Sequence, residues 1–283
     1  MTDRSSITAQ LDLISDPDEK AAAEARNALR QFDVGMMLLD HWLDGRTAHP
    51  NLRSSDLLTL NRFALDGIHP SAGTFRAGPV VIEGSAHQPP HAAFVPELVE
   101  DLCDYINANW HSHQAEFLAA YALWRLNWIH PFADGNGRTA RIVSYILLCA
   151  KLGFRLPGEL TIPEQIAADK SPYYSALEAS DRAFLTGKID LAAATGLIRR
   201  CLDAQLDSER PDQPPDRSDG TTVLVEGELL QNVRLTADPG LLTFDRSKKP
   251  IVSSLERNPV LFTGFFAILA AVLGAVLTIL FGK

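Results

Sequence analysis

The chain has 283 residues and a formal net charge of −9 at pH 7, a length that can bury one or two hydrophobic cores. The acidic balance argues against a general nucleic-acid binder, because such proteins present a basic face to phosphates. Cys103, Cys149 and Cys201 are far apart in the sequence, so we expect buried, reduced thiols of a cytosolic protein rather than a disulfide framework or a zinc site. The polar N-terminus predicts no signal peptide.

Residues 17–205 follow a mostly helical pattern. The first helix has the clearest start, with Asp16 as N-cap, Pro17 at the first position and Glu19 at the third, and it extends to about residue 42. Further helices are expected at 57–67, 96–107, 114–129, 139–152, 175–184 and 190–206. The predicted fold class is therefore mainly α.

The stretch from Gly73 to Pro90 interrupts the helical pattern. Glycines and prolines surround the apolar run Val80, Val81 and Ile82. This composition predicts a β-hairpin or an extended flap. An ordinary surface hairpin is the alternative interpretation.

The most informative segment is His-Pro-Phe-Ala-Asp-Gly-Asn-Gly-Arg-Thr-Ala-Arg at residues 130–141. A Gly-Asn-Gly turn can present successive backbone N–H groups to an anion, and the N-terminus of the following helix would favour the same negative charge. Two arginines spaced i,i+3 can both reach one polyphosphate. The candidate nucleotide-binding residues are Asp134, Gly135, Asn136, Gly137, Arg138 and Arg141.

Two side chains of this segment suit a reaction on the bound nucleotide. His130 precedes the turn, where its imidazole can take a proton from an attacking hydroxyl. Asp134 offers a carboxylate oxygen to Mg²⁺, which binds through one or two carboxylates together with substrate phosphates. A surface corner with charged residues is the alternative, but it leaves this combination unexplained.

The segment resembles the signature of the Fic family, His-x-Phe-x-(Asp/Glu)-Gly-Asn-Gly-Arg-x-x-Arg, at every specified position. The resemblance extends over about residues 15–205 and implies a Fic-type helical core with a hairpin flap. It implies an enzyme, a protein adenylyltransferase that moves AMP from ATP, with Mg²⁺, to a Ser, Thr or Tyr hydroxyl of a target protein. In this interpretation His130 is the catalytic base and Asp134 the metal ligand.

The resemblance also implies roles outside the motif. The flap at Val80, Val81 and Ile82 would pair with the target's backbone, by strand addition. Tyr173 and Tyr174, in Ser-Pro-Tyr-Tyr-Ser-Ala-Leu, would line the nucleoside pocket.

Autoinhibition is a further implication of the family pattern. Many Fic proteins hold a helix-borne Glu against the second motif arginine, here Arg141, and Glu24 is the candidate. The flanking Ser/Thr and Gly/Asn of that pattern are missing here, so a solvated Glu on the helix face is an equal alternative. Leu123 also departs from the family, since many relatives have a His there.

Other functions fit the same residues. One is removal of AMP, or transfer from another nucleotide donor, at the same site. Another is a catalytically dormant adaptor at a membrane. Loss of the His or of either Arg would favour the adaptor, and none is lost.

The chain is predicted to have three parts after a helical domain at 1–206. Residues 207–220 form a linker rich in Pro and charge, and residues 221–250 form a small β-like segment. Residues 259–281 are uncharged and long enough to cross a bilayer, which predicts a transmembrane helix.

The predicted transmembrane helix decides the expected localisation. Basic residues gather before it, so the catalytic domain is expected on the cytoplasmic side of a single-pass C-terminal anchor. Gly264 and Gly274 do not form a G-x-x-x-G pair, which leaves helix dimerisation unsupported. The expected partners are a target protein and a membrane, with a second copy of the chain as a further candidate and no nucleic acid.

Overall fold

The computed structural model describes residues 4–8, 12–45, 50–208, 233–234 and 243–244. The chain divides into two compact units, Met1–Pro215 and Asp216–Lys283, and each is described by itself. The first unit is mainly helical, as the sequence predicts. Its elements are β1 (Ser6–Ile7), α1 (Pro17–Leu43), α2 (Ser54–Leu65), β2 (Val81–Ile82), the 3-10 turn η1 (Ala92–Phe94), α3 (Val95–Ala108), α4 (Ala115–Ile129), α5 (Asn136–Leu152), α6 (Ile162–Ala168), α7 (Ser171–Leu185) and α8 (Ala192–Asp207).

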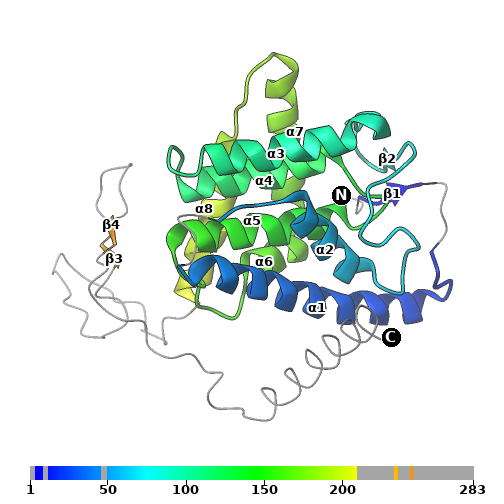
Figure 1. Cartoon of the computed structure of the whole chain (residues 1–283), viewed down its shortest axis with the longest axis horizontal. Helices are drawn as coiled ribbons and strands as arrows, with labels where there is room; N and C mark the ends of the chain where they lie inside the picture. Colours follow the sequence, from blue (N-terminus) through cyan, green and yellow to red (C-terminus); the bar gives the residue numbers. More distant parts are fainter. Residues whose placement is uncertain (1–3, 9–11, 46–49, 209–232, 235–242, 245–283) are drawn as a thin grey trace, which may run out of the picture. The chain divides into compact units, whose positions relative to one another are not determined.

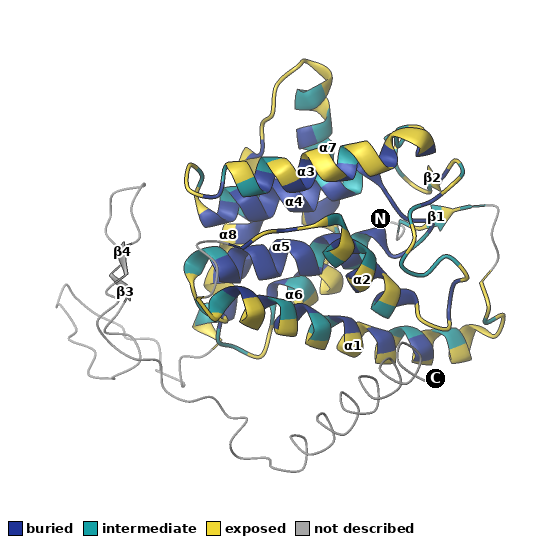
Figure 2. Ribbon diagram, in the orientation of Figure 1, coloured by how far each residue is buried: buried dark blue, intermediate teal, exposed yellow. Residues whose placement is uncertain are grey.

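Helices α4 and α5 form the centre of this unit (Figures 1 and 2). α4 is apolar on almost every face, and a helix of that kind must be enclosed by others. α5 packs against α4 and also contacts α1, α2 and α6. The loop that joins α4 to α5 carries the motif, so its two ends are held by the best-packed part of the core. Cys103, Cys149 and Cys201 are all free and buried, as expected.

Helix α1 approaches α5 closely at Gly35. A Cβ atom on Gly35 would lie 2.8 Å from Cγ1 of Ile142, closer than real carbon atoms pack. The missing side chain lets α1 lie directly against the motif helix. The N-terminal half of α1 then carries Glu24 to the motif.

The sequence predicted the helices better than their starts. The start of α1 is confirmed, with the Glu19 N–H donating to Asp16 Oδ1 at 2.8 Å. α2, α5 and α7 begin earlier than predicted. The first turns of α2 and α5 are polar and lack the apolar repeat, whereas α7 begins at Ser171 and Pro172, ahead of its two buried tyrosines. α6 was not predicted; it is short and begins with a capping box in which the Thr161 N–H donates to Glu164 at 2.8 Å.

The predicted β-hairpin between residues 73 and 90 is wrong. The only strand described there is β2, and its antiparallel partner is β1 near the N-terminus, with Ser6 opposite Ile82 and Ile7 opposite Val81. The preceding arm of the flap is bonded elsewhere, since the Arg76 N–H donates to Pro131 O at 2.9 Å. Pro79 lacks a backbone donor, which also shortens the strand.

In the second unit, the structure describes one antiparallel pair. β3 (Val233–Arg234) and β4 (Thr243–Phe244) place Val233 opposite Phe244. Both lie in the segment predicted to be β-like. Among the described residues no helix has the length and apolar character to span a membrane, and the predicted span at 259–281 lies outside them, as does most of the predicted linker.

Candidate active site

His130 ends α4 in a left-handed backbone conformation, with φ 50° and ψ 59°. Within the described part of the chain it is the one residue other than glycine with a positive φ. Its N–H still donates to Leu126 O at 2.9 Å, whereas Pro131 disfavours another helical turn, so the chain reverses here. A backbone in this uncommon region next to a cavity suggests a functional position.

The His130 imidazole is buried in the cavity wall, with 6% exposure. Burial lowers its pKa to about 4, so the ring is neutral at pH 7. Nδ1 lies 3.4 Å from the carbonyl oxygen of Asn127. When Nδ1 donates to that oxygen, Nε2 keeps its lone pair and can accept a proton, as a general base must.

The motif loop is ordered from inside by Asn136. Its amide donates to Phe132 O at 2.9 Å and accepts from the Phe132 N–H at 2.9 Å. Phe132 itself is buried, with its ring 5.8 Å from that of Phe75. Both ends of the Asn136 side chain are therefore used by the loop, although the residue belongs to the cavity wall.

Gly135 is the N-cap of α5 and has φ 75°. A Cβ there would also lie 3.0 Å from Nδ2 of Asn61. Buried Asn61 on α2 donates to Asp134 O at 3.0 Å and accepts from the Gly73 N–H at 3.1 Å, which ties the motif to the base of the flap. The Gly-Asn-Gly segment thus begins a helix, and its N–H groups belong to the first turn of α5, where an anion is favoured.

Arg138 lies between two carboxylates. Its Nη2 is 3.1 Å from Asp134 Oδ2 and 3.6 Å from Glu24 Oε1. The expected restraint of Arg141 by Glu24 is therefore replaced by a pair with the first motif arginine. Within the described residues Arg141 forms no ion pair, and it lines the cavity.

These residues surround a cavity of about 660 Å³, a volume typical of small-molecule sites. Tyr173 and Tyr174 line it from α7, and burial raises the pKa of Tyr173 to about 12. Of the predicted flap residues, Ile82 lines the cavity, Val80 is buried and Val81 is 61% exposed. The wall includes His130, Asp134, Gly135, Asn136, Gly137, Arg138, Arg141 and Glu24.

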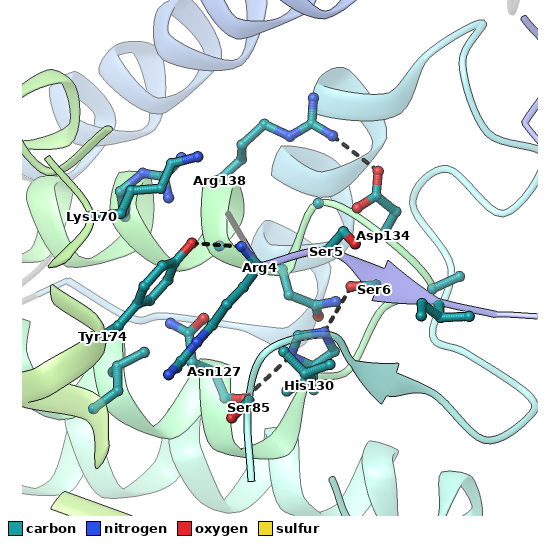
Figure 3. A pocket seen from close by; sticks show the side chains of 18 of the residues that line it. Arg4, Ser5, Ser6, Ser85, Asn127, His130, Asp134, Arg138, Lys170 and Tyr174 are labelled. Carbon is teal, nitrogen blue, oxygen red and sulfur yellow. Dashed lines mark hydrogen bonds and ion pairs between the residues drawn. The ribbon is translucent and has the colours of Figure 1, made fainter. Parts of the chain in front are cut away.

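Sequence reasoning missed the N-terminal segment. Residues Arg4 to Thr8 line the same cavity, and the Ser6 hydroxyl lies 2.9 Å from His130 Nε2 (Figure 3). A short polar segment carries no periodic signal, so nothing in its composition could have indicated this place.

Asn61 and Arg76 were also missed. Asn61 could have been noticed as a polar residue on the apolar stripe formed by Leu57, Leu60 and Ala64. Arg76 is buried, and its guanidinium donates to His130 O at 2.8 Å, to Gly78 O at 3.0 Å and to Pro90 O.

The donor set at Asp134 is compatible with Mg²⁺. The Asp134 side chain is 31% exposed and borders the cavity. No group of three or more His, Cys, Asp or Glu residues that could hold a metal occurs among the described residues. A single carboxylate is nevertheless what Mg²⁺ commonly takes from a protein when substrate phosphates supply further oxygens.

Residues 51–148, which contain the motif loop, match the sequence model of the Fic/DOC family. Over these residues the chain is therefore similar to the Fic/DOC family. The protein adenylyltransferase Fic of Drosophila willistoni is 32% identical over 169 residues, which are 56% of this chain and 31% of that protein. That of Drosophila melanogaster is 31% identical over 169 residues, with the same two shares. The match therefore spans about a third of these curated relatives.

Solved structures support the fold. Fic-1 from C. elegans superposes with a TM-score of 0.52 at 23% identity, covering 69% of this chain and 52% of that one. A Fic domain containing signaling protein from Bacteroides thetaiotaomicron gives a TM-score of 0.51 at 22% identity, covering 64% of this chain and 70% of that one. The helical arrangement around α4 and α5 is therefore that of Fic proteins.

Proposed function

We propose that this chain transfers AMP from ATP to a hydroxyl side chain of a target protein. The observation that carries the proposal is the neutral His130 imidazole, whose Nε2 lies 2.9 Å from a serine hydroxyl at the cavity. The N-terminus of α5 borders the same cavity. A base, an anion site and a position for a hydroxyl therefore meet in one place, and relatives named protein adenylyltransferase share the motif region.

In the proposed reaction, His130 Nε2 accepts the proton of the target hydroxyl while its oxygen attacks the α-phosphorus of ATP. The bond from that phosphorus to the oxygen bridging the β-phosphate breaks, and pyrophosphate leaves with the electron pair. The first-turn N–H groups of α5 and the guanidinium groups of Arg138 and Arg141 would stabilise the phosphate charge. Mg²⁺ held by Asp134 would neutralise further negative charge on the phosphates.

The target would be presented as an added strand. β2 lies at the cavity and pairs by backbone hydrogen bonds, which demand little of the partner's sequence. Exposed Val81 leaves room for a side chain of the incoming strand. Tyr173 and Tyr174 would contact the nucleoside from α7.

The test is incubation of the full chain with ATP, Mg²⁺ and a cell extract, followed by mass spectrometry for adenylylated hydroxyl residues. We expect adducts with the wild type and a loss of roughly 10²–10⁴-fold in rate for His130→Ala. Labelled UTP and other donors, and a preformed adduct as substrate, distinguish transfer of other nucleotides and removal of AMP. A His130→Ala variant that transfers AMP within about twofold of the wild type would exclude His130 as the base.

We further propose that residues 259–281 anchor the chain in a membrane with the catalytic domain on the cytoplasmic side. The support is the sequence alone, an uncharged segment with basic residues before it. Arginine at both Leu269 and Gly274 should cost about 5–7 kcal/mol on insertion scales. We expect the wild type to resist carbonate extraction and the double variant to be extracted; a wild type in the soluble fraction contradicts the anchor.

A further inference from the structure

The N-terminal segment already occupies the edge that a target would use. β1 pairs antiparallel with β2, and the Glu83 N–H donates to Ser5 O at 2.9 Å beyond the paired residues. The Ser5 hydroxyl also donates to Glu83 Oε2 at 2.8 Å. This is strand addition within one chain, in a defined register.

That register places Ser6 against the base. The Ser6 hydroxyl lies 2.9 Å from His130 Nε2, the nitrogen left unprotonated when Nδ1 donates to Asn127 O (Figure 3). Successive side chains of a strand point to opposite faces, so a slip of one residue would remove Ser6 from His130. A nucleophile and its base within hydrogen-bond distance form the pair that group transfer requires.

Arg4 fixes the other end of the segment. Its guanidinium lies 4.3 Å from the centre of the Tyr174 ring, its N–H donates to Tyr174 Oη at 3.2 Å, and it forms an ion pair with Glu178. The segment is thus held on β2 and on α7, with Ser6 between the two attachments. The cavity of about 660 Å³ remains beside it, bordered by the motif.

We infer that Ser6 is an internal acceptor, and that the chain adenylylates its own Ser6 hydroxyl in an intramolecular reaction. The inference rests on the proposed function. The Ser6 Oγ–H proton passes to His130 Nε2, a bond forms between Oγ and the α-phosphorus of ATP, and the bond from that phosphorus to the bridging oxygen breaks. Pyrophosphate carries away the electron pair, and Ser6 becomes a phosphodiester of AMP.

The first experiment locates the product. Full-length protein is incubated with ATP and Mg²⁺, digested and mapped by tandem mass spectrometry. We expect one AMP on Ser6 of the wild type and none on Ser6 of His130→Ala. Ser6→Ala should lose this adduct, whereas the matched control Ser55→Ala should keep it, because Ser55 is exposed on α2 and does not line the cavity.

The second experiment shows whether the reaction occurs within one chain. An intramolecular reaction has a rate constant that stays unchanged on tenfold dilution of the protein. Wild type mixed with a tagged His130→Ala chain should leave the tagged chain unlabelled. A rate constant that falls with dilution, together with a labelled tagged chain, would overturn the intramolecular assignment.

The remaining outcomes separate the inference from the proposed function. AMP on proteins of an extract, with Ser6 always unmodified, overturns the inference and leaves the function intact. No AMP on any protein with any variant contradicts the function itself. If deletion of residues 1–8 raises transfer to extract proteins, and Ser6 of the full-length chain is never modified, the N-terminal segment blocks the site and is not a substrate.

Discussion

Arg76 offers the strongest test of how the flap and the motif loop are joined. This buried guanidinium donates to carbonyl oxygens of four residues, and burial lowers its pKa. The acceptors belong to Gly78, Pro90, Ile129 and His130. Its own N–H donates to Pro131 O at 2.9 Å. One residue thus bonds to the motif loop, the arm of the flap and the segment that leads into η1.

Arg76→Met keeps a long side chain but leaves four carbonyl oxygens without this donor, of which Ile129 O is the most distant at 3.4 Å. At the lower end of the cost for unsatisfied buried groups, about 1 kcal/mol for each of the three closer oxygens, the variant should lose about 3 kcal/mol of unfolding free energy. That is a large part of the roughly 5–15 kcal/mol that stabilises a typical domain, and it corresponds to a melting temperature lower by about 6–12 °C. The unfolding free energy of Arg76→Lys should lie between those of the wild type and Arg76→Met, because one ammonium cannot reach all four acceptors.

Urea unfolding of the wild type, Arg76→Met and Arg76→Lys measures the change in unfolding free energy. The rate of adenylyl transfer below the melting temperature then measures whether His130 is still correctly placed. The control is Arg200→Met, since Arg200 is exposed on α8 and forms no hydrogen bond or ion pair among the described residues; it should change stability by less than about 0.5 kcal/mol. An Arg76→Met protein within about 0.5 kcal/mol of the wild type would refute the reasoning, because the guanidinium would then be replaceable at no cost.

Three further predictions concern the cavity. Glu24→Gln removes one partner of Arg138, and a partly exposed ion pair is worth about 0.2–1 kcal/mol, so ATP affinity should rise by up to about fivefold; an unchanged KM in ATP titration would leave Glu24 as a helix-face charge. Asn136→Ala leaves the buried N–H and C=O groups of Phe132 without their partner, and should lower the unfolding free energy in urea by about 2–4 kcal/mol. A loss of less than about 1 kcal/mol would show that the loop does not depend on this amide. His130 has a pKa of about 4 when folded and about 6.5 when unfolded, so between these values the unfolded chain binds the extra proton and stability falls as pH falls. From pH 6.5 to 5 the wild type should lose about 1.6 kcal/mol more unfolding free energy than His130→Gln, and equal losses in the two proteins would contradict the buried neutral ring.

The sequence predicted the parts of this molecule that depend on local patterns. The apolar repeats indicated each long helix, and the N-cap at Asp16 fixed the start of α1. The motif indicated His130, Asp134 and the two arginines, which the structure brings to one cavity. Each of these signals lies within a few turns of the chain, where residue order alone determines spacing.

What the sequence could not predict depends on contacts between distant segments. β2 pairs with β1 instead of with its own neighbour, and no local pattern reveals a strand partner so far away in the chain. The pairing of Glu24 with Arg138 rather than Arg141 likewise depends on how α1 lies against α5, which Gly35 permits. Arg76 has no apolar periodicity around it, because its role is to bond carbonyl oxygens of other segments.

Because β1 belongs to the same chain as β2, it sets the minimum affinity for β2 that any other protein needs in order to displace it. A covalently linked strand acts at an effective concentration that is on the order of millimolar for a short flexible connection. An external strand present at micromolar concentration must therefore bind β2 far more tightly than β1 does before it reaches His130. Arg4, which adds contacts to Tyr174 and Glu178, raises that minimum affinity further. Selectivity at this edge then depends on the chain's own N-terminus as much as on the sequence of the incoming target.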